Sequence, residues 1–160
     1  MSNTSDIRRQ PTIHVLSVSA TEEDLLALRS IFATSPCPLC PGYQWTLNHC
    51  DSARPPASVL RRGEVPILLY DRDTDPDAWR QLLAQCEGLA HPPCVIVTSR
   101  LADDRLWAEA LNLGAYNVLA KPFDAKEVTC MLGQAYLHWK DSALHRSARR
   151  GTHSAAAGCS

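Results

Sequence analysis

The sequence predicts an α/β fold in which a doubly wound, five-stranded parallel sheet carries helices on both faces. Five apolar segments of strand length alternate with five segments that have helical signals, and this alternation is typical of parallel sheets. Thr98 ends one predicted strand, and Lys121 follows the next. Parallel strands end at a common edge, so we expect both side chains to lie where open α/β sheets place their ligands.

The predicted strands are short apolar runs bounded by turn-forming residues. The third is a continuous apolar run that is typical of a buried strand. The second is the least distinct of the five. In chain order, the strands are predicted at residues 12–18, 45–50, 65–70, 94–98 and 116–120.

The predicted helices are marked by their ends as much as by their apolar stripes. Thr21 or Ser19 can cap the first helix, and Asp75 followed by Pro76 favours a helix start. Gly114 is typical of a helix end, and Asp124-Ala-Lys-Glu127 is a capping box. In chain order, the helices are predicted at residues 23–32, 55–62, 77–86, 103–113 and from 124 to about 140.

The length of 160 residues indicates one domain with short tails. We expect a disordered lead at residues 1–11, a domain at 12–140 and a disordered, basic tail at 141–160. Within the domain, three prolines between residues 35 and 42 break regular structure. A cysteine- and proline-rich insertion is therefore predicted near residues 35–44.

Composition excludes several classes of function. The net charge is −1, so no overall basic field attracts nucleic acid or an anionic membrane, and neither partner is expected. The apolar runs are too short to span a membrane. The first ten residues lack the apolar core of a signal peptide, which predicts a cytoplasmic location.

The chain has seven cysteines, an odd number that argues against a disulfide framework. Cys37 and Cys40 have the spacing of half a zinc site. The other half would be His49 and Cys50, whose adjacency gives poor ligand geometry. We therefore expect free thiols in a proline-stiffened insertion, with a cysteine-based metal or redox sensor as an open alternative.

Three stretches carry a family resemblance: residues 93–99 (Pro-Cys-Val-Ile-Val-Thr-Ser), 110–115 (Ala-Leu-Asn-Leu-Gly-Ala) and 119–123 (Leu-Ala-Lys-Pro-Phe). In order and spacing they resemble the receiver domain of bacterial-type two-component response regulators, the CheY-like fold, over residues 12–140. The resemblance implies that Asp71, at the end of the third strand, accepts a phosphoryl group. It implies that Thr98 hydrogen-bonds this group as a switch, that Lys121 forms an ion pair with it, and that the Lys121–Pro122 bond is cis.

The resemblance also implies a Mg²⁺ ion, which neutralises charge between the acceptor carboxylate and the phosphoryl group. Receivers hold it partly with an acidic pair after the first strand, where this chain has Ser19 and Ala20. Asp71 and Asp73 remain as candidate ligands of a weakened Mg²⁺ site. The acids at 22–24 lie about one turn further on, where side chains can point to solvent.

The function implied is that of a single-domain response regulator in a two-component phosphorelay, a phosphoacceptor rather than an enzyme. A sensor histidine kinase or phosphotransfer protein would donate to Asp71, and a downstream protein would be contacted. The 103–140 face would be available to that protein or to a second copy. The alternative is a pseudo-receiver, an interaction module that works without phosphorylation because Ser19 and Ala20 replace the acidic pair.

Overall fold

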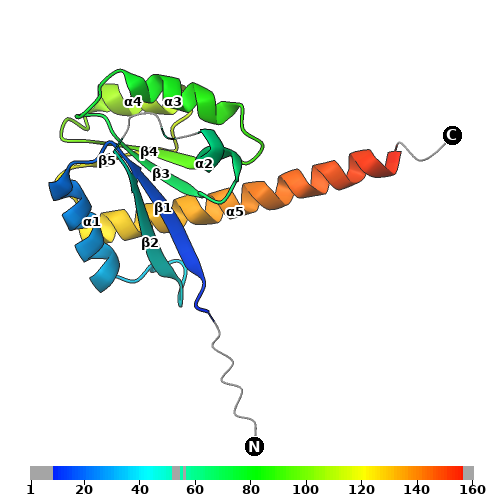
Figure 1. Cartoon of the computed structure of the whole chain (residues 1–160), viewed down its shortest axis with the longest axis horizontal. Coiled ribbons are helices and arrows are strands. Elements are labelled where there is room, and N and C mark those ends of the chain that lie inside the picture. The colour runs from blue at the N-terminus through cyan, green and yellow to red at the C-terminus, as the bar shows by residue number, and fades with distance from the viewer. Residues whose placement is uncertain (1–8, 52–54, 56, 157–160) are drawn as a thin grey trace, which may run out of the picture.

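The structure is a computed structural model that describes residues 9–51, 55 and 57–156. One sheet lies between two layers of helices (Figure 1). Its strands are all parallel, in the order β2-β1-β3-β4-β5, which confirms the predicted fold class. The strands are β1 (Thr12–Val18), β2 (Gln44–Cys50), β3 (Ile67–Asp71), β4 (Cys94–Ser99) and β5 (Asn117–Ala120).

Side chains alternate across the strands and build a separate core on each face of the sheet. On one face, Leu16, Tyr70 and Val97 pack with Trp79 and other residues from the helices of that side. On the other, Ile13, Leu69 and Ile96 pack with residues such as Leu28 and Leu132. The first face carries α2 (Ala57–Arg61), α3 (Ala78–Glu87) and α4 (Asp104–Asn112), and the second carries α1 (Glu22–Thr34) and α5 (Ala125–Ala156).

Local capping fixes where the helices next to the carboxyl edge begin. Thr21 is the N-cap of α1, and its hydroxyl accepts a hydrogen bond from the backbone N–H of Asp24 at 3.2 Å. Asp103 caps α4 in the same way, with a 2.8 Å bond from the N–H of Leu106. Each cap satisfies a donor that the first helical turn leaves free. The helix α1 therefore starts close to the end of β1, and α4 starts close to the end of β4.

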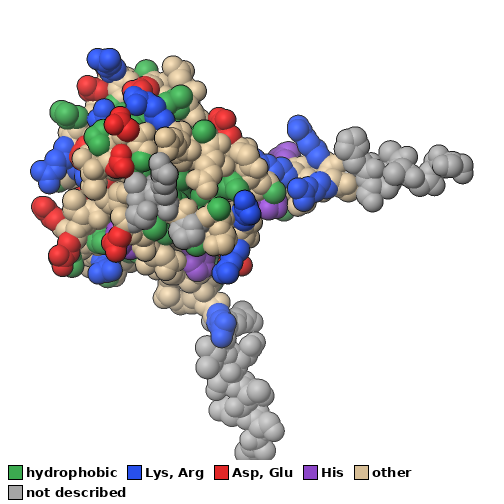
Figure 2. Space-filling view, turned by 45° about the horizontal axis from the view of Figure 1, so that its top comes forward, with side chains coloured by type: hydrophobic (Ala, Val, Ile, Leu, Met, Phe, Trp, Pro, Cys, Tyr) green, Lys and Arg blue, Asp and Glu red, His purple; other side chains and the backbone are tan. Residues whose placement is uncertain are grey.

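The last helix differs from its prediction. We expected it to end near residue 140 and a disordered tail to follow, but α5 continues to Ala156. Residues 141–156 contain no proline and are rich in alanine and arginine, which favour helix. The Arg146 guanidinium also donates a 2.7 Å hydrogen bond to the carbonyl of Ala90. Figure 2 shows this part of α5 as an arm that projects from the domain and carries Arg and His side chains.

The predicted insertion at residues 35–44 packs into the core. Cys37 and Cys40 are both buried beside residues of α5. Burial raises the pKa of the Cys40 thiol to about 11, which keeps it protonated and weakly nucleophilic at neutral pH. The insertion therefore contributes apolar packing on the α1/α5 face. Of the predicted tails, residues 1–8 and 157–160 lie outside the described residues.

Within the described residues, none of the helices has the length and apolar character that crossing a membrane requires.

Candidate functional site

The sheet brings the three predicted site residues to one edge. Asp71 is the last residue of β3 and is in register with Thr98 of β4. Lys121 directly follows β5, and its backbone N–H donates to the carbonyl of Ser99 at 3.0 Å. All three positions lie at the carboxyl ends of neighbouring parallel strands, the usual ligand position in this class of sheet.

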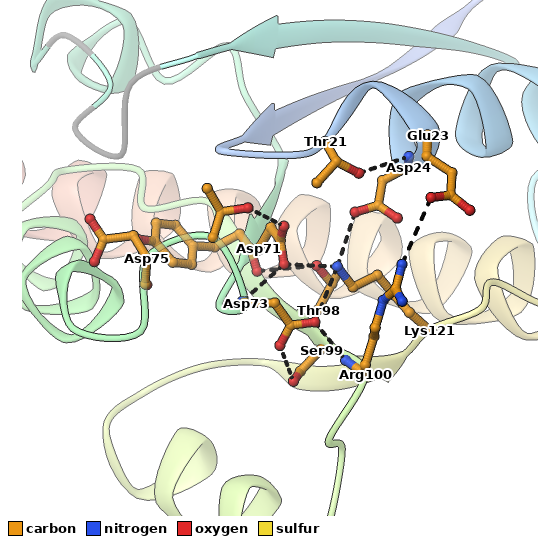
Figure 3. A network of polar contacts seen from close by, with 12 residues as sticks. Thr21, Glu23, Asp24, Asp71, Asp73, Asp75, Thr98, Ser99, Arg100 and Lys121 are labelled. Carbon is orange, nitrogen blue, oxygen red and sulfur yellow. Dashed lines mark hydrogen bonds and ion pairs between the residues drawn. The ribbon is translucent and has the colours of Figure 1, made fainter.

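The ammonium group of Lys121 is the centre of a buried ionic network (Figure 3). Its Nζ atom lies 2.9 Å from Oδ1 of Asp71, 2.9 Å from Oδ2 of Asp24 and 3.3 Å from Oδ2 of Asp73. The lysine side chain is only 4% exposed. A buried ammonium needs such partners, because removing its charge from water is costly. The network has one cation for three carboxylates, so it carries a formal excess of negative charge.

Asp71 is fixed from several sides. Its side chain is 1% exposed, and Oδ1 accepts the backbone N–H of Asp73 at 3.0 Å as well as Lys121. Its other oxygen, Oδ2, accepts the hydroxyl of Thr74 at 2.7 Å. Because Thr74 lies in the turn that directly follows Asp71, a movement of this turn that carried Thr74 away would uncover Oδ2.

Asp73 connects the turn after β3 to the end of β4. Its carboxylate accepts the Ser99 hydroxyl at 2.7 Å and the backbone N–H of Arg100 at 2.8 Å. Burial alone would raise the pKa of Asp73, but these hydrogen bonds and the nearby ammonium of Lys121 outweigh it and lower the pKa below 3.8. Asp73 is therefore ionised at neutral pH.

Lys121 keeps its proton for a related reason. Burial alone would lower the pKa of Lys121, but its hydrogen bonds and charge attraction to Asp71 and Asp24 outweigh burial and raise the pKa above 10.5. The site therefore holds a fixed positive charge next to Asp71 throughout the physiological pH range. Such a charge is suited to binding an anionic group that arrives at this carboxylate.

Two neighbouring hydroxyls at the end of β4 have different partners. The Thr98 hydroxyl donates a long, 3.3 Å hydrogen bond to the backbone carbonyl of Tyr70. The Ser99 hydroxyl instead donates to Asp73 and accepts the N–H of Leu101 at 3.1 Å. Thr98 is thus at the predicted edge, while Ser99, which carried no predicted role, is the hydroxyl inside the carboxylate network.

Asp24 is the second residue that sequence reasoning missed. We allowed the acids at 22–24 to point to solvent, but Asp24 is 8% exposed and contacts Lys121. Ser19 has a φ of 60°, so the chain turns sharply after β1 before Thr21 caps α1. That turn directs the third residue of α1 toward the site. The spacing of Thr21 and Asp24 matches a helix cap, which was the one sequence signal for this placement.

In this structure, the carboxylates of the predicted Mg²⁺ site, Asp71 and Asp73, contact an ammonium group. Carboxylate oxygens are the right type of ligand for a hard cation. Here, however, Asp24, Asp71 and Asp73 converge on the Lys121 ammonium. Across the described part of the chain, no group of three or more His, Cys, Asp or Glu side chains is arranged to hold a metal ion. The Lys121 ammonium therefore lies among the carboxylates that would be the ligands of a metal ion.

Comparison with known proteins gave matches only among solved structures; no family model and no curated protein matched. The signal receiver domain of an HD domain-containing protein from Pseudomonas fluorescens Pf-5 is 24% identical, with a TM-score of 0.65 over 89% of this chain and 98% of that one. The signal receiver domain of a Luxo repressor protein from Vibrio parahaemolyticus is 16% identical, with a TM-score of 0.66 over 85% and 97%.

A third match is a response regulator receiver protein from Pseudoalteromonas atlantica, with 13% identity and a TM-score of 0.56 over 81% of this chain and 98% of that one. These structures are matched over nearly their whole length, so the likeness covers the full sheet and both helix layers. The Lys121–Pro122 bond is also cis, as the resemblance implied. By its strand order, its parallel sheet and these likenesses, the chain has the CheY-like fold of response regulator receiver domains.

Proposed function

We propose that this chain is a signal receiver that accepts a phosphoryl group on Asp71 and passes the signal on by contact with another protein. The observation that carries the proposal is the 2.9 Å contact between Nζ of Lys121 and Oδ1 of Asp71 at the carboxyl edge of the sheet. A nucleophilic carboxylate with a permanent cation beside it supports such a transfer, because the cation offsets the negative charge of the arriving group.

The transfer would use the free lone pair of an Asp71 carboxylate oxygen. That oxygen forms a new P–O bond, the P–O or P–N bond to the donor breaks, and the donor leaves with the electron pair. Lys121 then neutralises part of the negative charge on the phosphoryl oxygens. Access to Oδ2 requires the Thr74 hydroxyl to move away, since this hydroxyl covers it at 2.7 Å. The chain acts here as an acceptor, not as an enzyme with turnover.

Sensor histidine kinases and phosphotransfer proteins are the donors that this chemistry suits. The solved structures that resemble this chain include the signal receiver domain of a two-component signal transduction histidine kinase from Clostridium thermocellum. The fold supports a role in such a relay, and a downstream protein would recognise the phosphorylated form. The exposed side of α4 and α5 offers it a surface, with Trp107 and Leu137 about half exposed.

The test is intact-mass analysis after incubation with acetyl phosphate, with and without Mg²⁺. We expect a phosphate-sized mass gain in the wild type and none in Asp71→Asn. Asp77→Asn is the matched control, because Asp77 lies in the same loop region with a side chain that is 95% exposed. It should label like the wild type.

The comparison with and without Mg²⁺ shows whether phosphorylation of Asp71 requires the metal ion. A gain that requires Mg²⁺ means that the carboxylates rearrange to admit a cation, whereas an equal gain without Mg²⁺ means that the Lys121 ammonium is sufficient. If no gain occurs under conditions that label a control receiver, the proposal fails. The chain would then be a pseudo-receiver, whose network of Lys121 and three carboxylates is structural.

A further inference from the structure

A cavity of about 300 Å³ lies at the opposite edge of the sheet from Asp71, where β4 begins. Three segments surround it: the loop before β4 with His91, the turn before β5 with Tyr116, and α5 with Trp139. The volume is at the lower end of the range for small-molecule sites, which runs from roughly 300 to 1,000 Å³. The cavity is thus large enough for a small ligand and separate from the ionic network.

The continuation of α5 past its predicted end supplies one wall. Ser142, Ala143 and Arg146 all line the cavity, and all lie beyond residue 140. The hydrogen bond from Arg146 Nη1 to the carbonyl of Ala90 holds this part of the helix against the loop before β4. One bond leaves most of the five guanidinium N–H donors available. Without the extension, the cavity would be an open depression.

The side chains around the cavity combine cationic and aromatic character. Arg146 is charged, and His91 and His138 supply ring nitrogens. Tyr116 and Trp139 supply aromatic surface, and the Tyr116 ring lies 5.4 Å from that of His138. Guanidinium groups bind phosphate and carboxylate through paired hydrogen bonds, and aromatic faces bind planar rings.

Among the residues that the structure describes, neither Asp nor Glu lines the cavity. Asp141 precedes the lining residue Ser142, and its carboxylate lies 3.5 Å from Nδ1 of His145. Glu87 does not line the cavity, but it lies next to the lining residue Gly114: a Cβ on that glycine would lie 3.2 Å from Oε1 of Glu87. An anion in the cavity would therefore meet donors and aromatic surface on the α5 side, and the side where Glu87 adjoins Gly114 would be less favourable for it.

We propose that this cavity binds a small planar anion, an aromatic ring that carries a phosphate or carboxylate group. The anionic group contacts Arg146 and the two histidines, and the ring packs on Trp139 and Tyr116. This site lies at the amino end of the strands and does not depend on the phosphoryl reaction at Asp71. Its occupant would bridge α5 to the loops that precede β4 and β5.

Phenyl phosphate is a suitable probe, and isothermal titration calorimetry with the full chain measures its binding. We expect a Kd on the order of 1 mM or tighter for a ligand of this size. Arg146→Gln should weaken binding at least tenfold. Arg150→Gln is the matched control: it removes the same charge from the same exposed arm, but Arg150 does not line the cavity, so binding should change less than twofold.

Two further measurements show whether phenyl phosphate binds in this cavity. Ala143→Trp keeps every charge but fills the cavity, and it should abolish binding while its melting temperature shows that the domain is folded. In ¹⁵N-resolved NMR spectra, phenyl phosphate should shift the amide of Gly114 and leave that of Asp73 unchanged. Equal weakening by Arg146→Gln and Arg150→Gln, or undiminished binding to Ala143→Trp, would overturn the proposal.

Phenol and inorganic phosphate complete the design, because each carries one half of the probe. We expect both to bind at least tenfold more weakly than phenyl phosphate. If inorganic phosphate binds as tightly as phenyl phosphate, the ring contributes nothing and the aromatic part of the proposal is wrong. Absence of phenyl phosphate binding at 10 times the expected Kd, about 10 mM, would reject the site altogether.

Discussion

The ammonium group of Lys121 lies 2.9 Å from a carboxylate oxygen of Asp24 and so joins the end of β5 to the first turn of α1. The same ammonium contacts Asp71 at the same distance. Lys121 is thus shared between a residue of the expected site and one from outside it. The stability of this edge depends on a cation that is outnumbered by its anionic partners.

Lys121→Met should be much more destabilising than Asp24→Asn. The methionine variant leaves three carboxylates without their cation, and losing one partner of a buried ion pair costs about 3–5 kcal/mol. Asp24→Asn removes one charged hydrogen bond but also relieves repulsion among the acids, so we expect about 1–2 kcal/mol. Urea unfolding at pH 7 measures both free energies. An Asp24→Asn variant as unstable as Lys121→Met would contradict this ranking.

The lowered pKa of Asp73 predicts a dependence of stability on acidic pH. Because the folded pKa lies below 3.8, the ionised carboxylate stabilises the fold fully above the unfolded pKa, and this contribution is lost as pH falls through the folded pKa. Unfolding free energies measured between about pH 5 and pH 3 should therefore fall more steeply for the wild type than for Asp73→Asn. Parallel curves would show that Asp73 contributes nothing, and Asp77→Asn should follow the wild type.

The two hydroxyls at the end of β4 should differ in their effect on stability. Ser99 is fully buried, and Ser99→Ala removes hydrogen bonds to Asp73 and Leu101, at a cost of about 1–2 kcal/mol. Thr98→Val keeps the side-chain shape and removes only the long bond to Tyr70, so we expect less than about 1 kcal/mol. Thermal unfolding of the two variants compares them directly. The reverse order would mean that Thr98 has stabilising contacts beyond this bond.

Gly133 and Gly151 provide a matched pair within α5. A Cβ at residue 133 would lie 2.8 Å from the Cys37 sulfur, whereas one at residue 151 meets no described atom within 4 Å. Gly133→Ala should destabilise the domain by about 1–3 kcal/mol through overpacking. Gly151→Ala should raise helical content, since alanine is about 1 kcal/mol better than glycine in a helix.

Calorimetry and far-ultraviolet circular dichroism measure these two effects. Adding Cys37→Ala to Gly133→Ala should restore most of the lost stability, because the sulfur is the atom in the way. If the double variant is no more stable than Gly133→Ala, the overpacking explanation is wrong.

The sequence was sufficient to predict the sheet and the positions of Asp71, Thr98 and Lys121. Each of these residues follows or ends an apolar strand, and the carboxyl ends of parallel strands must share an edge. The network around them was harder to predict. The direction of Asp24 depends on the backbone turn at Ser19, whose positive φ has no sequence signal in a serine. Without that turn, an acid in the first turn of α1 is expected at the surface.

The end of α5 was missed for a different reason. Residues 141–156 have no continuous apolar stripe, a pattern that predicts disorder. Their helical propensity and the hydrogen bond from Arg146 to the carbonyl of Ala90 stabilise the helix in place of an apolar stripe. The absence of a buried face predicts exposure, and exposure alone does not decide between coil and helix.

The length of α5 gives the domain a mechanical lever. A helix of 32 residues measures about 48 Å at 1.5 Å per residue, and it starts four residues after Lys121. A tilt of about 5° at its first turn would displace its far end by about 4 Å. A small tilt of the first turn of α5, at the carboxyl edge of the sheet, thus becomes a displacement as wide as a side chain at the far end of the helix.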